Sequence, residues 1–217
     1  MTLVIAAHPD DELLGCGATL CKWKDSGFPP HIAFAGTGRE GGTQAEDAER
    51  VAAKAGWKLE PFGPFRDNAF GPIAEVAAWV EDLVKRRGSR RILIHSADEL
   101  NQDHQILRHA CLIACRPFAS TWHLNLGQSR ELWSFEVPGS TGYEFHPNIF
   151  VEMPGHFKRK VQLLAMYARE AQLAPHPRSP FMLEARARHW GSFAGVQMAE
   201  AFRLEFQLIG QTSGTAS

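Results

Sequence analysis

The sequence has little of what marks the more specialised protein classes. Only four cysteines occur in 217 residues and none lies in a C-x-x-C pair, so we expect buried small apolar side chains rather than a disulfide scaffold or a cysteine metal site. Charge of neither sign is in excess, since 23 Lys and Arg residues against 24 Asp and Glu residues leave a net charge of -1. Nucleic-acid binding and electrostatic membrane binding both need a basic excess, so the composition argues against both classes.

Long apolar runs are also missing. No stretch reaches the roughly 20 apolar residues that span a bilayer, and the first residues lack the basic region of a secretory signal. These absences predict a cytoplasmic protein with no membrane span. The hydrophobic share of 44% and the charged share of 22% are typical of a globular chain. We expect one domain over residues 1–210 and a polar tail over residues 211–217; whether the chain forms a homo-oligomer stays open.

Short apolar runs alternate with helical patterns through the first half of the chain. The predicted strands are residues 2–7, 31–35, 58–61 and 91–95, and the predicted helices are residues 13–23, 45–55, 73–87 and 103–115. This alternation predicts an α/β fold, a Rossmann-like three-layer sandwich with a mostly parallel sheet. The second half is less regular and forms a C-terminal extension, with strands expected at residues 131–137, 148–153 and 202–208, a turn at residues 139–142, and helices over residues 157–172 and up to Trp190.

A dense polar cluster follows the first predicted strand. His8, Asp10, Asp11 and Glu12 lie within five residues, and Pro9 disfavours helical angles at His8, so the segment is a shaped loop. One of these acids would suffice to cap the helix that follows. Three carboxylates and an imidazole exceed what capping needs, which favours a functional site.

A second polar cluster follows the fourth predicted strand, over residues 98–104. In a purely structural interpretation, Asn101 caps the next helix, Asp103 lies in its first turn and His104 is a surface residue. If the first and fourth strands end side by side, however, the two clusters meet at the carboxyl edge of the sheet, where ligands of such folds bind. The two histidines His8 and His104 with the carboxylate of Asp11 then provide three ligands and an open fourth position, as in a catalytic zinc site.

A glycine-rich stretch offers a competing interpretation. Residues 36–41 match G-x-G-x-x-G, follow a predicted strand and precede Glu60 by about the expected distance. A dinucleotide-dependent oxidoreductase would rest on this motif. The motif follows the second strand rather than the first, however, and Gly42 and Thr43 delay the helix, so a loop bordering a substrate pocket fits the same residues better.

With both clusters identified, the chain resembles the PIG-L/LmbE-like family of zinc-dependent N-acetylglucosaminyl deacetylases. The resemblance begins with the AHPDDE run at residues 7–12, continues through the Asp103-His104 pair and ends at residue 202, so that it covers nearly the whole chain. Its further segments are residues 14–17, 101–104, 136–141, 147–150, 176–179 and 199–202, with Lys160 and Tyr167.

The resemblance implies specific roles for individual residues. It implies one zinc ion per chain, with three ligands: His8, Asp11 and His104. Asp10 matches the general base of the family, and Asp103 matches an aspartate that supports the ligands. Asn101 stands where many members have a histidine credited with helping the oxyanion. Asparagine can donate a hydrogen bond there but cannot deliver a proton.

The expected reaction is hydrolysis of the N-acetyl group of an amino sugar or an amino-sugar conjugate. The substrate is therefore a small N-acetylated molecule, with Arg39 and Asp67 as candidate substrate-binding residues. Two further interpretations remain: an amidase that acts on a larger N-acyl sugar or thiol conjugate with the same metal site, and a non-catalytic sugar-binding protein. The sequence leaves open the substrate, the choice between zinc and iron, and whether Asn101 serves the oxyanion or the substrate.

Overall fold

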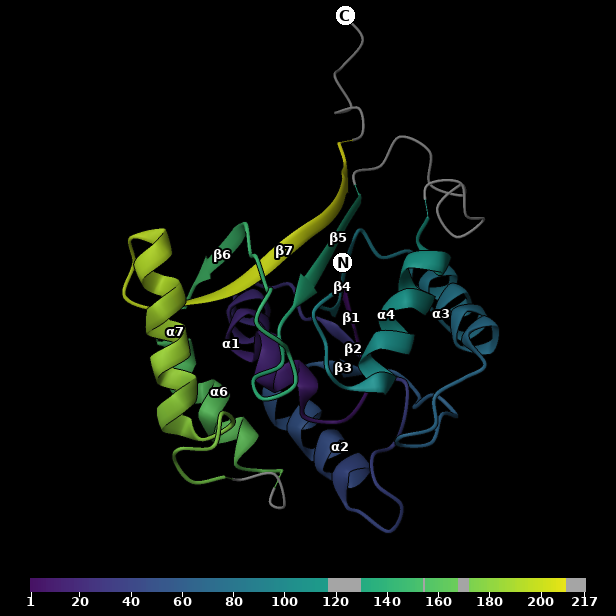
Figure 1. Ribbon diagram of the computed structural model, residues 1–217, viewed down its shortest axis with the longest axis horizontal. Coiled ribbons are helices and arrows are strands. Elements are labelled where there is room, and N and C mark those ends of the chain that lie inside the picture. Colours follow the sequence, from purple (N-terminus) through teal and green to yellow (C-terminus); the bar gives the residue numbers. More distant parts are fainter. Residues whose placement is uncertain (117–129, 154, 168–171, 210–217) are drawn as a thin grey trace, which may run out of the picture.

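The fold is built on one seven-stranded sheet (Figure 1). The computed structural model describes residues 1–116, 130–153, 155–167 and 172–209. The strands lie in the order β3-β2-β1-β4-β5-β7-β6. They are β1 (Thr2–Ala6), β2 (His31–Phe34), β3 (Lys58–Leu59), β4 (Arg91–His95), β5 (Arg130–Phe135), β6 (Ile149–Glu152) and β7 (Ala199–Leu208). The first five are parallel, and β7 runs antiparallel to both β5 and β6. The predicted, mostly parallel α/β sheet is confirmed.

Helices cover both faces of this sheet (Figure 1). One face packs against α1 (Asp11–Asp25), α2 (Gln44–Ala55), α6 (His156–Leu164) and α7 (Pro180–Ala194), and the other against α3 (Ile73–Arg87) and α4 (Gln102–Ala114). In β1, Val4 and Ala6 point into the first layer while Leu3 and Ile5 point into the second, because side chains alternate along a strand. The chain is therefore the predicted three-layer sandwich.

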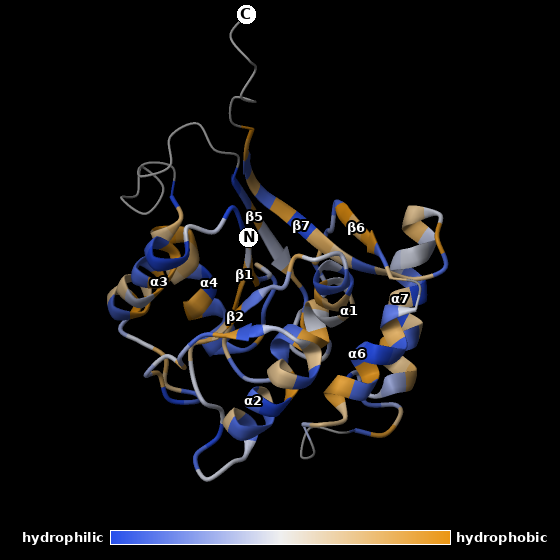
Figure 2. Ribbon diagram, turned by 180° about the vertical axis from the view of Figure 1, so that it is seen from behind, coloured by the Kyte–Doolittle hydropathy of each residue, from blue (hydrophilic) through white to orange (hydrophobic). Residues whose placement is uncertain are grey.

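The last strand, β7, inserts between β5 and β6. It alternates between hydrophobic and hydrophilic residues, as Figure 2 shows, which agrees with the half-buried strand predicted there. The predicted turn at residues 139–142 consequently does not join neighbouring strands. It hydrogen-bonds instead to the segment after β4, where Leu100 N–H donates to the Ser140 carbonyl at 2.8 Å. The predicted tail lies outside the described residues. The helix predicted over residues 157–172 was too long, because α6 ends at Leu164 and residues 165–167 already form a turn; residues 168–171 lie outside the described part.

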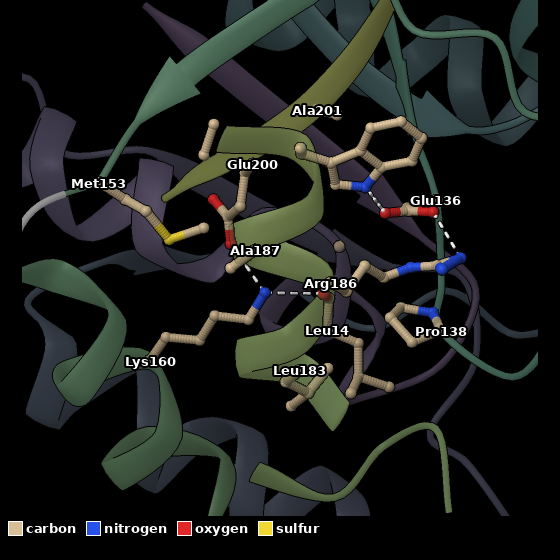
Figure 3. Close-up of a pocket in the computed structure, with 13 residues that line it drawn as sticks. Leu14, Glu136, Pro138, Met153, Lys160, Leu183, Arg186, Ala187, Glu200 and Ala201 are labelled. Carbon is tan, nitrogen blue, oxygen red and sulfur yellow. Dashed lines mark hydrogen bonds and ion pairs between the residues drawn. The ribbon is translucent and has the colours of Figure 1, made fainter. Parts of the chain in front are cut away.

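A buried ion pair ties α1 to the C-terminal strands (Figure 3). Lys160 Nζ lies 2.8 Å from Glu200 Oε1 and also donates to the Leu14 carbonyl at 2.8 Å. The Glu200 carboxylate accepts hydrogen bonds from the backbone N–H groups of Ala18 and Thr19, in the middle of α1, at 3.0 and 2.7 Å. These contacts border a small cavity of about 20 Å³. They fix the position of the helix whose first residues belong to the polar cluster after β1.

Close packing of α1 against β5 requires glycine at one position. A Cβ at Gly15 would overlap the ring of Phe135 and the carbonyl of Glu136. All four cysteines, which are Cys16, Cys21, Cys111 and Cys115, are free and buried in these helical layers. They pack as small apolar side chains, as predicted.

Candidate active site

A polar pocket lies at the carboxyl ends of β1 and β4, which pair in parallel as neighbours. Its volume is about 160 Å³. Five segments line it: the loop after β1, the glycine-rich loop before α2, residues 67–68, the start of α4, and Arg178 just before α7. The two polar clusters predicted to meet therefore do meet, because the strands they follow lie side by side.

Three ligand atoms converge in this pocket. His104 Nε2 lies 3.3 Å from His8 Nδ1 and 3.2 Å from Asp11 Oδ2, and His8 Nδ1 lies 3.6 Å from the same oxygen. Around a tetrahedral zinc ion with bonds of about 2.0–2.1 Å, neighbouring ligand atoms lie about 3.3 Å apart. The other oxygen of Asp11 is buried and has no hydrogen-bond partner among the described residues. Spacing and donor types thus fit a single metal ion.

Each of the two histidines is held from behind by a carboxylate. His8 Nε2 lies 3.0 Å from Asp103 Oδ2 and 3.1 Å from Asp67 Oδ1, and His104 Nδ1 lies 2.8 Å from Glu99 Oε2. A carboxylate behind an imidazole keeps the proton on the outer nitrogen and turns the inner one toward a metal. Asp103 is itself fixed at the start of α4, where it accepts backbone N–H bonds from residues 68 and 70.

The same carboxylates perturb the histidine pKa values. Burial opposes the charge on His8, but Asp103 and Asp11 outweigh it and raise its pKa to about 10. Burial likewise opposes the charge on His104, and Asp11 and Glu99 raise its pKa to about 9. Burial alone would raise the pKa of Asp11, yet His104 and His8 hold it well below its ordinary value. Any metal bound here must displace protons from strongly basic imidazoles, so its affinity rises with pH.

Asp10 is buried beside these ligands in a strained conformation. Its φ of 113° is left-handed, which costs a non-glycine residue about 1–3 kcal/mol. It precedes α1, but its side chain makes no capping hydrogen bond, so the capping interpretation does not hold for this residue. Asp10 Oδ2 instead accepts from Arg178 Nη1 at 3.0 Å, and its backbone N–H donates to Glu12 Oε2 at 3.1 Å.

Asn101 does cap its helix. Its Oδ1 accepts from the backbone N–H groups of Asp103 at 2.8 Å and His104 at 3.4 Å, as the structural interpretation of the second cluster predicted. Since Oδ1 is used in this way, the amide nitrogen is the group of Asn101 that can donate into the pocket, which this residue lines. The same interpretation placed His104 at the surface, whereas its exposure is 1%.

The two candidate substrate residues occupy different positions. Arg39 is exposed at the pocket rim, on the glycine-rich loop, which borders the pocket as expected of a substrate loop. Asp67 also lines the pocket, but its carboxylate contacts His8. It is therefore placed to orient the imidazole as well as to meet a ligand.

Three further residues contact the predicted site residues. Glu99 binds His104, Arg178 binds Asp10, and His95 stacks on His104 with ring centroids 3.9 Å apart. Burial lowers the pKa of His95 well below its ordinary value, so this ring is neutral, and its Nε2 accepts the N–H of Ala7 at 2.9 Å. Glu99 lies within the second cluster, and His95 ends β4. Arg178 lies in the segment 176–179 that contributes to the family resemblance, but its contact with Asp10, 168 positions away, depends on the fold.

Sequence comparison identifies the family. The profile of PIG-L, described as GlcNAc-PI de-N-acetylase, matches residues 3–115. The chain belongs to the PIG-L family. A relative of this PIG-L protein, an uncharacterised deacetylase named YaiS from Escherichia coli K12, is 28% identical over 162 residues, which cover 68% of the present chain and 79% of YaiS.

Solved structures share the fold. The N,N'-diacetylchitobiose deacetylase of Pyrococcus horikoshii is 19% identical with a TM-score of 0.78, over 94% of the present chain and 82% of its own. GalB of Pseudomonas putida KT2440, a 4-carboxy-2-hydroxymuconate hydratase, is 17% identical with a TM-score of 0.71, over 98% and 99%. Because one fold carries a deacetylase and a hydratase, the reaction of this PIG-L protein must be argued from its site. Among the described residues, no helix has the length and apolar character required to cross a membrane.

Proposed function

We propose that this PIG-L protein is a zinc-dependent hydrolase that removes the N-acetyl group of an amino sugar or an amino-sugar conjugate. One observation carries the proposal. Three ligand atoms, from His8, Asp11 and His104, are spaced for one metal ion. Beside them lies the buried carboxylate of Asp10, which makes no capping hydrogen bond to α1. The pocket volume of about 160 Å³ favours a small acyl group such as acetyl over a long acyl chain.

Different residues around this centre perform different steps of amide hydrolysis. Bound zinc would acidify a water molecule and polarise the amide carbonyl. Asp10 accepts the proton of the attacking water and returns it to the nitrogen as the C–N bond breaks, which yields acetate and a free amine. General acid–base help of this kind contributes about 10²–10⁴-fold to the rate. Arg178, hydrogen-bonded to Asp10, holds that carboxylate in place.

The negative oxygen that develops on the substrate needs a hydrogen-bond donor besides the metal. We assign this role to the amide nitrogen of Asn101, whose orientation is set by the capping bonds of its oxygen. Glu99 and Asp103 orient the two histidine ligands. Arg39 and Asp67 contact hydroxyl groups of the sugar at the rim.

Metal content and acetate release test this assignment together. The protein is purified without chelator and assayed on a panel of N-acetylated sugars and glycosides. We expect one equivalent of zinc and release of acetate. Asp10→Asn should keep the zinc and lose at least about 10²-fold in kcat, whereas His104→Ala should lose the metal. Asp82→Asn, on the exposed side of α3, is the matched control and should change neither.

Three results would each refute a part of the proposal. Full turnover in Asp10→Asn would refute the assignment of Asp10 as the general base. A full zinc complement in His104→Ala would refute the assignment of the three metal ligands. Zinc bound by the wild type without acetate from any member of the panel would refute the deacetylase activity and leave the metal site intact.

A further inference from the structure

A second, larger recess lies next to the metal pocket. Its volume is about 530 Å³, and its lining is mainly apolar, with Leu100, Pro138, Tyr143, Pro177 and Met182. Leu100 is 71% exposed and Tyr143 is 103% exposed. Large apolar side chains gathered around a hollow at the surface of a globular domain mark a binding site.

The recess and the metal pocket are lined by consecutive residues at two points of the chain. Leu100 directly precedes Asn101, and Pro177 directly precedes Arg178; the first of each pair lines the recess and the second lines the pocket. Ligand sites usually measure about 300–1,000 Å³. The metal pocket alone, at about 160 Å³, is too small for such a site, whereas pocket and recess together reach this size.

The recess is also fixed relative to the reacting centre. Thr141 Oγ1 and Ser140 Oγ both donate to the Glu99 carboxylate, at 2.6 and 2.5 Å. Gly142 N–H donates to the Asp98 carbonyl at 2.6 Å. Glu99 in turn holds His104, so one carboxylate fixes both a metal ligand and the loop that carries Tyr143. A group bound in the recess is therefore held at a set position from the metal.

We propose that the recess binds an apolar aglycone, an aryl or short alkyl group joined to the amino sugar through its glycosidic oxygen. The inference rests on the proposed function and adds the substrate class. An acetyl group is short enough to fit within the metal pocket and does not reach the recess. The apolar group in the recess is therefore attached to the sugar and stays on the amine product. Arg186, which also lines the recess, is paired with Glu136 at 2.9 Å, which favours an uncharged group.

The test compares phenyl and methyl 2-acetamido-2-deoxyglucosides in the full-length, zinc-loaded protein. We expect kcat/KM for the phenyl glycoside to exceed that for the methyl glycoside about tenfold, the gain expected from burying roughly 60 Å² of apolar surface. Tyr143→Ser and Leu100→Ser should bring this ratio close to one. Phe28→Ser is the matched control, because Phe28 is an aromatic residue, 73% exposed, that does not line the recess. It should leave the ratio unchanged.

Binding of the product amines separates this inference from the reaction itself. Calorimetry with phenyl and methyl 2-amino-2-deoxyglucosides should show about tenfold tighter binding of the phenyl compound, and Tyr143→Ser should abolish the difference. Absence of acetate release together with this binding difference would refute the proposed function and support the recess. Equal binding of the two amines, or a preference that survives both substitutions, would overturn the aglycone site. Faster cleavage of an N-octanoyl than an N-acetyl methyl glycoside, lost in Tyr143→Ser, would overturn it too, because the recess would then hold the acyl chain.

Discussion

Glu99→Gln is the most informative substitution in the site, because it preserves the size of a buried side chain and removes only its charge. The Glu99 carboxylate receives hydrogen bonds from three groups: the ring of His104 and the hydroxyls of Ser140 and Thr141. An amide can still accept from His104, but its NH₂ group then faces Thr141. The Thr141 hydroxyl already accepts the backbone N–H of Val137, so its own proton loses its acceptor.

We expect Glu99→Gln to weaken zinc binding more than it lowers turnover. Loss of a carboxylate behind a histidine ligand typically weakens metal binding 10–100-fold, which corresponds to about 1.4–2.7 kcal/mol. We would measure the zinc dissociation constant by competition with a chromophoric chelator at constant pH. Circular dichroism would show that the variant remains folded. Turnover at saturating zinc should fall less than affinity does, since the ligand itself is still present.

Glu205→Gln is the matched control for this experiment. Glu205 also accepts hydrogen bonds from a hydroxyl and from a cationic side chain, Ser134 and Arg108, in a largely buried setting. It touches none of the ligand residues, so its amide should leave zinc affinity unchanged. Equal zinc affinity in Glu99→Gln and the wild type would refute the argument that this carboxylate positions His104.

Three further predictions concern the cap, the histidine protons and the ion pair beneath α1. Asn101→Ser keeps a capping oxygen but removes the amide donor, so kcat should fall about 10²–10³-fold while the melting temperature stays close to that of the wild type; an unchanged kcat would contradict the oxyanion role. His8 and His104 have pKa values of about 10 and about 9 when folded, above the ordinary 6.5. In metal-free protein the stabilisation from these two groups should therefore be complete at pH 6 and be lost as pH rises through 9 to 10, and melts in chelator that show no such loss would refute this. Lys160→Met leaves Glu200 without its buried partner and should cost about 3–5 kcal/mol in urea unfolding; a loss below about 1 kcal/mol would contradict the structural role.

Much of the fold was predictable, because hydrophobic period and chain breakers act locally. The helix over residues 73–87 and the strand over residues 91–95 have the predicted bounds. The neighbouring positions of β1 and β4 followed from the usual order of such sheets, and this order brought His8 and His104 together. What the sequence could not show was the insertion of β7 between β5 and β6, since antiparallel pairing depends on contacts far apart in the chain.

The inner part of the site was likewise more predictable than its surroundings. The metal-ligand candidates stand in dense polar clusters. Glu99 lies in one of these clusters and Arg178 in a segment of the family resemblance, but their contacts with His104 and Asp10 follow only from the fold. Asp67 shows the same limit. Its position in the pocket was expected, but its contact with His8 depends on how the loop before α3 closes over that ring.

The path of β7 through the sheet has a consequence for the order in which the protein becomes functional during synthesis. The three candidate metal ligands and Asp10 are all made within the first 104 residues. The carboxylate that holds the middle of α1, and the strand with which β6 pairs, emerge only after residue 198. Because chains are made from the N-terminus at a finite rate, the candidate ligands and the carboxylates behind the two histidines precede by nearly a hundred positions Glu200, which holds the middle of α1. A nascent chain that has released only its first half therefore carries the candidate ligands, but it lacks Arg178 beside Asp10 and Glu200 beneath α1.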